Sequence, residues 1–533
     1  MDRTAIRATM LLCSCLVACG DDPEANLDPL MVKVATGDVH GSIAGTSRQF
    51  LGIPYAKPPV GSLRWKAPVA ADPWSTPLEA TQFGKRCAQI ANATLQNKAS
   101  TDEDCLYLNV WTPSPAPKKA AVMVWLHGGG NINGSANEPV PFLNTGLFYS
   151  GEFLAEKRGV IVVSLNYRLG VFGFFAHPDL VGEEGHAGNQ GLQDQQLALQ
   201  WVHDNIAQFG GDPANVTLFG ESAGSLDTCL HVASPASGGA GLFQRAISES
   251  GGCTTRQAIA TEAGAVATKF ATDLGCTGAG SLTCLRGKAA ADIMASADVA
   301  SPDPTVALSF APNVDGWFMP AQPRQIYDDG NAAKIPYLLG SNTDEGTLFL
   351  PATKPTNQDE YMAALTRMFG AIAAGQVAAL YSMDKFMNAM PNAATAALAR
   401  VIGDSRLVCT TFDSAVRQAH AGAHVFMYNF DIPVPATIAP GLGATHGSEL
   451  TFVFATSPLL AADPAQQSAS DAIQRYWTNF AKTGDPNGAP DPSWPAFTEA
   501  ANVRLNLATT QTAVTDFRAT ECAFWRAGYA MQF

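Results

Sequence analysis

Residues 216–224 read Val-Thr-Leu-Phe-Gly-Glu-Ser-Ala-Gly, an apolar run that ends in a serine between two glycines. The run is typical of a buried β-strand, and the residues after it open a predicted helix. Glycines at 220 and 224 permit a sharp strand-to-helix turn, which lifts the Ser222 hydroxyl clear of a sheet and leaves the Ala223 N–H beside it. The five-residue pattern by itself is weak, because a glycine-rich chain often contains it by chance. Its strand–turn–helix context predicts an α/β fold that carries a nucleophilic serine.

A second glycine motif lies upstream of the serine. His127-Gly128-Gly129-Gly130 directly follows the apolar run 121–126. Consecutive glycines let backbone N–H groups approach a substrate oxygen closely, and an oxyanion loop precedes the serine in this order. Alone the motif would be an ordinary glycine turn, but together the two motifs indicate acyl-transfer chemistry.

The chain from residue 121 onward alternates short apolar runs with helical stretches. Helical spacing is clear over residues 192–208, and the other strand-like runs lie at 159–165, 244–248, 335–339 and 424–430. This alternation predicts a mostly parallel central sheet with helices on both faces. We expect residues 31–533 to form one catalytic domain with a helical insertion around 355–400, although plain surface helices fit that Ala-rich stretch as well.

The base and the acid of such a site are expected after the serine, in the order serine, acid, histidine. The histidines that follow Ser222 are His231, His420, His424 and His446. His446 lies in a glycine-flanked loop, which suits a residue that must reach across a cleft. The acid candidates are Asp344 and Glu345, just beyond the run 335–339, and the pattern does not separate them.

Composition limits the classes of function. Hydrophobic residues make up 47% and charged residues 15% of the 533 residues, and the net charge is −14. The chain can therefore bury a large core, and its acidity disfavours nucleic acid as a partner. Eight cysteines lie beyond the N-terminal segment, an even number that indicates disulfides in an exported chain, whereas a zinc site is disfavoured because no CxxC spacing occurs. No signal for an oligomeric state is present.

Several longer motifs make the chain resemble the type-B carboxylesterases, the family of cholinesterases, liver-type carboxylesterases and fungal lipases. Residues 209–224 and 103–113 match the two long signatures of that family. Shorter matches lie at 50–56, 166–170, 188–192 and 522–525. The resemblance covers nearly the whole chain beyond its N-terminal segment and implies the α/β-hydrolase fold.

The resemblance also implies roles for individual residues. It selects Glu345 as the triad acid and His446 as the base, and it places the oxyanion N–H groups on Gly129, Gly130 and Ala223. The activity that it implies is hydrolysis of small to medium carboxylic esters through an acyl-enzyme, with a small-molecule ester as the partner and no metal or cofactor. We expect activity to rise over roughly pH 6–7.5 as a histidine titrates. Glu221 and Glu449 occupy further acidic positions of the family, for which structural hydrogen bonding and an effect on charge in the cleft are equally good explanations.

The same resemblance implies three disulfides. These are Cys87–Cys105, Cys276–Cys284 and Cys409–Cys522. Cys229 and Cys253 are not general positions of the family. A fourth bridge and two buried free thiols both remain open for this pair.

Two other functions compete with the esterase interpretation of the sequence. A lipase-like acylglycerol hydrolase would need an apolar lid, but residues 88–104 are short and polar and contain no aromatic residue. A cholinesterase-like adhesion protein would have lost the triad, whereas Ser222, Glu345 and His446 are all present. We therefore expect a serine carboxylesterase.

The first residues are typical of an export signal. Arg3 and Arg7 precede the apolar stretch 8–18, which is too short to span a bilayer. It ends in Leu-Val-Ala before Cys19 and resembles a bacterial lipobox. The sequence thus predicts a signal peptide at 1–18, a lipid on Cys19, a tether at 19–30 and anchoring at a bacterial membrane. An ordinary signal peptide with a periplasmic or secreted product is the alternative.

Overall fold

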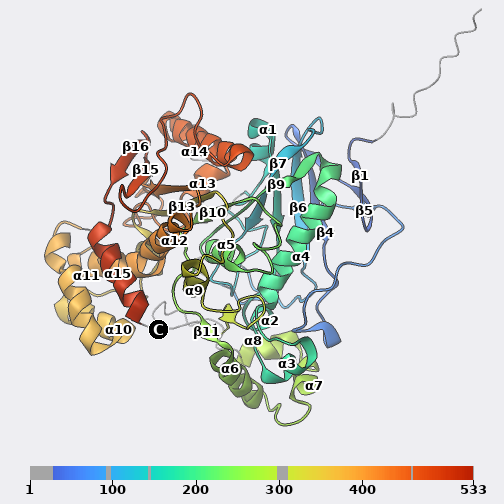
Figure 1. Cartoon of the computed structure of the whole chain (residues 1–533), viewed down its shortest axis with the longest axis horizontal. Helices are drawn as coiled ribbons and strands as arrows, with labels where there is room; N and C mark the ends of the chain where they lie inside the picture. The colour runs from blue at the N-terminus through green and yellow to red at the C-terminus, as the bar shows by residue number, and fades with distance from the viewer. Residues whose placement is uncertain are drawn as a thin grey trace, which may run out of the picture.

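The computed structural model describes residues 28–91, 98–141, 146–296, 310–389, 391–457 and 460–531. The predicted signal peptide and most of the predicted tether lie outside these residues. The main feature is a twisted sheet of 11 strands in the order β16-β15-β14-β13-β10-β9-β7-β8-β6-β4-β3, drawn as arrows in Figure 1. In sheet order, the strands are β16 (Thr512–Thr515), β15 (Val503–Leu507), β14 (Val425–Phe430), β13 (Tyr337–Asn342), β10 (Arg245–Glu249), β9 (Gly211–Glu221), β7 (Ala120–Leu126), β8 (Ile161–Leu165), β6 (Tyr107–Pro113), β4 (Ser47–Pro54) and β3 (Ser42–Ala44).

The strands from β8 to β15 in this order pair in parallel. Both edges of the sheet are antiparallel, through β16 at one end and through β6, β4 and β3 at the other. The predicted mostly parallel sheet is therefore confirmed. Smaller sheets lie outside the main one. A three-stranded sheet is formed by β1 (Met31–Val34), β2 (Gly37–His40) and β5 (Leu78–Glu79), and a two-stranded sheet by β11 (Ala258–Ile259) and β12 (Asn313–Val314).

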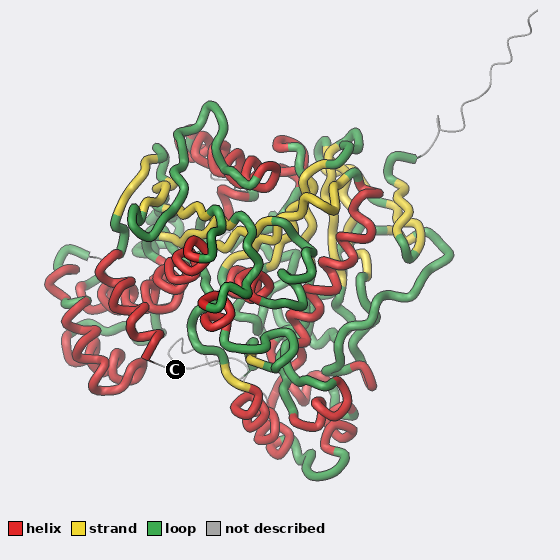
Figure 2. The backbone as a smooth tube through the Cα atoms, in the orientation of Figure 1, coloured by secondary structure: helices red, strands yellow, loops and turns green. Residues whose placement is uncertain are grey.

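Helices cover both faces of the sheet, as expected for parallel strands that are apolar on both sides. Along β7, Val122 and Val124 enter one buried cluster, and Met123 and Trp125 enter the cluster on the opposite face. Figure 2 shows helices on both sides of the strands, and the labels in Figure 1 place α1 and α14 above the sheet and α5 and α12 below it. The α-helices are α1 (Glu152–Arg158), α2 (Gly170–Gly173), α3 (Pro178–Glu184), α4 (Gln190–Asn205), α5 (Ala223–Ala233), α6 (Ala260–Asp273), α7 (Ser281–Arg286), α8 (Ala290–Ser296), α9 (Pro323–Asp328), α10 (Gln358–Leu380), α11 (Ala393–Gly403), α12 (Cys409–His420), α13 (Leu450–Val453), α14 (Pro464–Thr483) and α15 (Ala519–Met531).

Predicted and observed boundaries differ by a few residues. Strand β9 begins at Gly211, five residues before the predicted run, and β13 continues to Asn342 beyond the predicted 335–339. Helix α4 ends at Asn205, and a 3-10 turn continues to Phe209 instead of the helix that was predicted to reach 208. A hydrophobic pattern does not detect strand ends that lack apolar residues. The first residues of β9 belong to the strand through backbone pairing with β7, which begins at Gly211 and Ala120.

Residues 358–403 form α10 and α11, which pack beside α15 (Figure 1). Within the described residues, α10 is long and apolar enough for a membrane span by length and composition alone, a criterion that core helices of soluble proteins also meet. However, a φ of 76° at Gly370 divides it into two, and Arg367 lies near its middle. A cation at the centre of a span costs about 2.5–3.5 kcal/mol for insertion. Tyr361 and Leu365 are buried against the protein, so we treat α10 as part of the folded domain.

Within the part of the chain that the structure describes, four disulfides connect these elements. Three are the pairs that the family resemblance implies: Cys87–Cys105, Cys276–Cys284 and Cys409–Cys522. The fourth joins Cys229 to Cys253, so these cysteines are not free thiols.

Candidate active site

Parallel strands bring the predicted site residues to one edge of the sheet. Ser222 follows β9, His127 follows β7, and Glu345 lies three residues beyond β13. These three strands all run in the same direction, and ligands of such sheets bind beyond the carboxyl ends of the strands. The fold therefore assembles groups that lie more than 200 residues apart in sequence.

Ser222 occupies the tight turn between β9 and α5, with φ 58° and ψ −118°. An L-residue rarely adopts this conformation, which costs about 1–3 kcal/mol and persists only where the surroundings impose it. Two backbone hydrogen bonds hold the turn: Ser222 N–H donates to Glu249 C=O at 2.9 Å, and Leu226 N–H donates to Ser222 C=O at 3.0 Å. The structure thus contains the strained turn that the sequence context predicts.

The two glycines of the motif are required by close backbone contacts. A Cβ at Gly220 would lie 2.5 Å from Gly224 O, and a Cβ at Gly224 would lie 2.1 Å from Leu126 O. Both distances are too short for any side chain. The glycines therefore let β9, β7 and α5 converge directly beneath the serine.

The glycine loop after β7 lies against this turn. A Cβ at Gly128 would be 3.0 Å from Ser222 Cβ, and Gly129 and Gly130 have φ values of 108° and 66°. In the described part of the chain, the N–H groups of Gly129 and Gly130 donate no hydrogen bond to another protein group. The N–H of Ala223, the first residue of α5, has no acceptor within its helix. Free N–H donors beside the serine are what an oxyanion requires.

His446 and Glu345 are joined directly. His446 Nδ1 lies 2.6 Å from Glu345 Oε2, and Asn342 N–H donates to Glu345 Oε1 at 2.6 Å. Both side chains are buried, and the ring of Phe349 lies 4.8 Å from that of His446, centre to centre. The carboxylate therefore orients the imidazole and leaves Nε2 for chemistry.

The Nε2 atom of His446 lies 3.0 Å from Glu221 Oε1, on the residue next to the serine. Among the described residues, no hydrogen bond joins the Ser222 hydroxyl to His446, a contact that is often long in enzymes without a bound substrate. The structure thus brings Glu345 to His446 and places His446 beside the Glu221–Ser222 turn.

The competing candidates occupy other environments. His231 is buried in α5 between Ser237 and Gln195, and burial lowers its pKa to about 3. His420 and His424 are exposed. Asp344 faces Arg400 at 3.5 Å and accepts a hydrogen bond from Ala444 N–H at 3.1 Å. Among the described residues, none of these four side chains forms a hydrogen bond or ion pair with Ser222 or His446.

The sequence model of the carboxylesterase family matches residues 28–525. The chain belongs to the carboxylesterase family. It is also similar to a cholinesterase of Mus musculus, with 37% identity over 540 aligned residues that cover 94% of this chain and 87% of that protein. The predicted family and α/β-hydrolase fold are confirmed, and the chain is a serine carboxylic-ester hydrolase.

This carboxylesterase surrounds its histidine with buried carboxyl groups. Burial lowers the pKa of His446, but the negative charges of Glu221 and Glu345 outweigh it and raise that pKa to about 9. Burial raises the pKa of Glu221 to about 7, an effect that His446 opposes. Burial also raises the pKa of Glu449 well above its usual range. The site therefore holds protons that exposed carboxyl groups would release at neutral pH.

Sequence reasoning missed one member of this group, Glu249. It ends β10, accepts a hydrogen bond from Trp477 Nε1 at 3.0 Å, and has its pKa raised to about 8 by burial. Its backbone carbonyl is the acceptor for Ser222 N–H. The glutamate that directly follows the short run 246–248 was the available signal.

Proposed function

We propose that this carboxylesterase hydrolyses small to medium carboxylic esters with Ser222, His446 and Glu345 as its triad, through an acyl-enzyme. The observation that carries the proposal is the hydrogen-bonded His446–Glu345 pair beside the strained Ser222 turn. No acylglycerol lid is favoured, because the loop from Ala88 to Asp104 carries no aromatic residue.

The proposed chemistry proceeds in two acyl transfers. The Ser222 hydroxyl gives its proton to His446 Nε2 while Oγ bonds to the ester carbonyl carbon, whose oxygen becomes an oxyanion and accepts hydrogen bonds from the N–H groups of Gly129, Gly130 and Ala223. The carbon–oxygen bond to the alcohol then breaks, and His446 returns the proton to the leaving oxygen. Water repeats these steps and releases the acid.

The range of esters is tested by varying acyl and alcohol size separately in a panel of p-nitrophenyl and alkyl esters. We expect kcat/KM to be highest for short and medium acyl groups in solution. Higher kcat/KM for emulsified long-chain acylglycerols would favour the lipase-like alternative.

The pH profile should report the buried charges around His446. Only neutral His446 accepts the serine proton, and its pKa is raised to about 9, so activity should fall as pH drops through a value above the ordinary 6.5. This moves the expectation from sequence, pH 6–7.5, to higher pH. Glu221→Gln removes one negative charge beside Nε2 and should shift the acidic limb of kcat/KM to lower pH.

The control for this shift is Glu360→Gln, which removes the same charge from an exposed position at the start of α10. We expect its pH profile to match that of the parent enzyme. An acidic limb that stays in place in Glu221→Gln would show that Glu221 does not set the pKa of His446.

The enzyme is not expected to be a choline-ester specialist, although it resembles a cholinesterase. In cholinesterases, an aromatic face in the loop of the first disulfide binds the quaternary ammonium, and here that loop has none. Loss of a cation–π contact forfeits about 2 kcal/mol, or roughly thirty-fold in selectivity. We expect a kcat/KM ratio near one or below for a choline ester over its 3,3-dimethylbutyl isostere. A ratio above about ten would show a cation site, with Phe349 beside His446 as its first candidate.

The N-terminal processing is a prediction from the sequence, since Cys19 lies outside the described residues. Four disulfides accord with an exported protein. We propose lipidation of Cys19 and expect mass spectrometry of the mature protein to find a lipid-modified N-terminus there, with Cys19→Ser as the unmodified control. A mature N-terminus elsewhere would leave an ordinary signal peptide and a periplasmic or secreted enzyme.

A further inference from the structure

The disulfide between Cys229 and Cys253 lies directly behind the nucleophile turn. Cys229 is in α5, two helical turns after Ser222, and Cys253 is four residues beyond the end of β10. Both side chains are fully buried. This bridge is also the one that the family resemblance does not imply.

The five residues Glu249–Cys253, here called the support segment, contact the serine turn at several points. Glu249 C=O accepts the hydrogen bond from Ser222 N–H, and Gly251 C=O accepts one from Ser225 Oγ at 2.6 Å. A Cβ at Gly251 would lie 2.7 Å from Ser222 O. The support segment therefore holds the backbone of Ser222 from outside the turn.

The support segment has an unfavourable conformation of its own. Ser250 has a φ of 60°, and its N–H donates to Gly340 C=O at 2.8 Å. Gly252 is pressed against α12, where a Cβ would lie 2.2 Å from Thr410 O. A segment in such a conformation persists only when its surroundings over-determine it.

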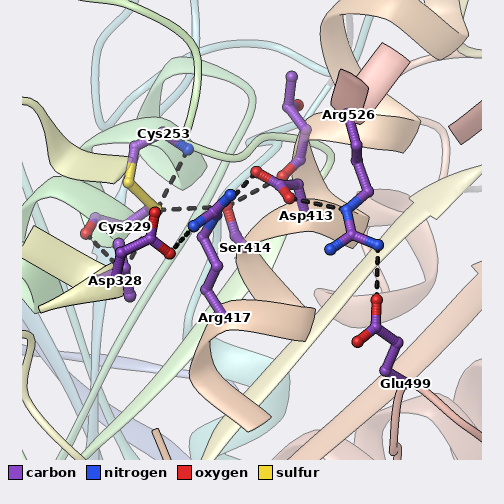
Figure 3. A network of polar contacts seen from close by, with 10 residues as sticks. Cys229, Cys253, Asp328, Asp413, Ser414, Arg417, Glu499 and Arg526 are labelled. Atoms are coloured by element: carbon purple, nitrogen blue, oxygen red, sulfur yellow. Dashed lines mark hydrogen bonds and ion pairs between the residues drawn. A yellow bond between two sulfur atoms is a disulfide. The ribbon is translucent and has the colours of Figure 1, made fainter. Parts of the chain in front are cut away.

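The disulfide closes the support segment onto α5. Cys253 N–H donates to Cys229 Sγ at 3.2 Å, and the same sulfur lies 3.7 Å from Ser414 Oγ on α12 (Figure 3). Helix α12 is itself anchored to other elements, since Asp413 accepts a hydrogen bond from Arg526 of α15 and Arg417 pairs with Asp328 of α9 (Figure 3). The disulfide thus joins α5 to the support segment, which itself packs against the anchored helix α12.

We propose that the Cys229–Cys253 disulfide is a positioning element for catalysis, which holds the support segment against α5 and thereby keeps Ser222 in its strained turn. The inference rests on the proposed role of Ser222. Most disulfides act chiefly by restricting the unfolded chain, which affects stability and leaves turnover unchanged. This one should also affect turnover, because a displacement of about 1 Å at a reacting atom can cost about a hundred-fold in rate.

The test compares Cys229→Ala/Cys253→Ala with Cys276→Ala/Cys284→Ala, which removes a disulfide between α6 and α7 away from the serine turn. Rates are measured on p-nitrophenyl butyrate well below both unfolding midpoints. We expect both variants to lose thermal stability, but only the first to lose about ten- to a hundred-fold in kcat, with KM changed by less than about three-fold. Its rate of labelling by a fluorophosphonate, which reads the nucleophile directly, should fall in parallel.

A second variant, Cys229→Val/Cys253→Ala, fills the space of the sulfurs without the bond and serves if the alanine pair does not fold. A folded variant of either kind whose kcat and labelling rate match those of the Cys276→Ala/Cys284→Ala control would overturn the proposal. The Ser222→Ala variant separates this result from a failure of the proposed function. If hydrolysis persists in Ser222→Ala, the triad assignment fails. If hydrolysis depends on Ser222 but survives loss of the Cys229–Cys253 bridge, only the positioning role is refuted.

Discussion

Ser222→Ala is expected to lower kcat for ester hydrolysis by at least about 10⁴-fold while the protein remains folded. Alanine lacks the oxygen that bonds to the acyl carbon, so only the oxyanion N–H groups and substrate binding remain. The methyl group fits the turn without a new contact, since the substitution only removes the hydroxyl oxygen. The measurement is the single-turnover and steady-state rate on p-nitrophenyl butyrate, with circular dichroism to establish the fold.

The matched control is Ser296→Ala, at the exposed end of α8. Its rate should equal that of the parent enzyme. Purified Ser222→Ala with more than a few per cent of the parent rate would refute the assignment of the nucleophile.

Glu345→Gln is expected to lower kcat by about 10³–10⁴-fold, the second largest effect. The carboxylate accepts from His446 Nδ1 at 2.6 Å, and in the proposed mechanism it stabilises the positive charge that the ring gains on taking the serine proton. A neutral amide of the same shape provides no such charge, and its NH₂ group can present a donor to Nδ1, which favours the wrong tautomer. We expect KM to change little, because the interaction is made mainly in the transition state.

Asp344→Asn is the control that decides between neighbouring acids. Asp344 faces Arg400 and the backbone of Ala444, so its loss should cost less than about ten-fold in kcat. A larger loss in Asp344→Asn than in Glu345→Gln would reverse the assignment of the triad acid.

The two predictions share a physical basis. In the proposed mechanism, Ser222 acts only if its backbone turn is held, and His446 acts only if its ring is oriented and its charge is balanced. The first condition depends on the glycines at 220 and 224 and on Glu249 C=O. The second depends on Glu345 and on the buried Glu221, which together raise the pKa of His446. Loss of either condition leaves a folded protein with little turnover.

Local sequence was sufficient for the parts of the site that depend on neighbouring residues. The apolar run before Gly220, the small residues around Ser222 and the glycines after His127 determine backbone conformation within a few residues. Steric exclusion of a Cβ acts over such short distances, so these features can be read along the chain. The alternation of apolar runs likewise predicted the parallel sheet, because burial on both faces requires apolar side chains on both faces of each strand.

Other properties depended on segments that only folding brings together. The sequence pattern left Asp344 and Glu345 equivalent, and the family resemblance selected Glu345, but the 2.6 Å contact to His446 spans 101 residues. The pairing of Cys229 with Cys253 was open for the same reason. The role of Glu249 was missed because it depends on Trp477 and Ser222, which lie on other elements.

The sequence by itself therefore determined the fold class and the glycine-built turn that carries Ser222, the predicted nucleophile, since these follow from short-range sterics and hydrophobic periodicity. The tertiary structure alone decided which acid touches His446, which cysteines form the fourth bridge and how far the pKa of His446 rises. Desolvation and Coulomb energy are sums over all groups within several ångströms. Those groups come from β9, β10, β13 and the loop after β14, and no local stretch of sequence contains their distances.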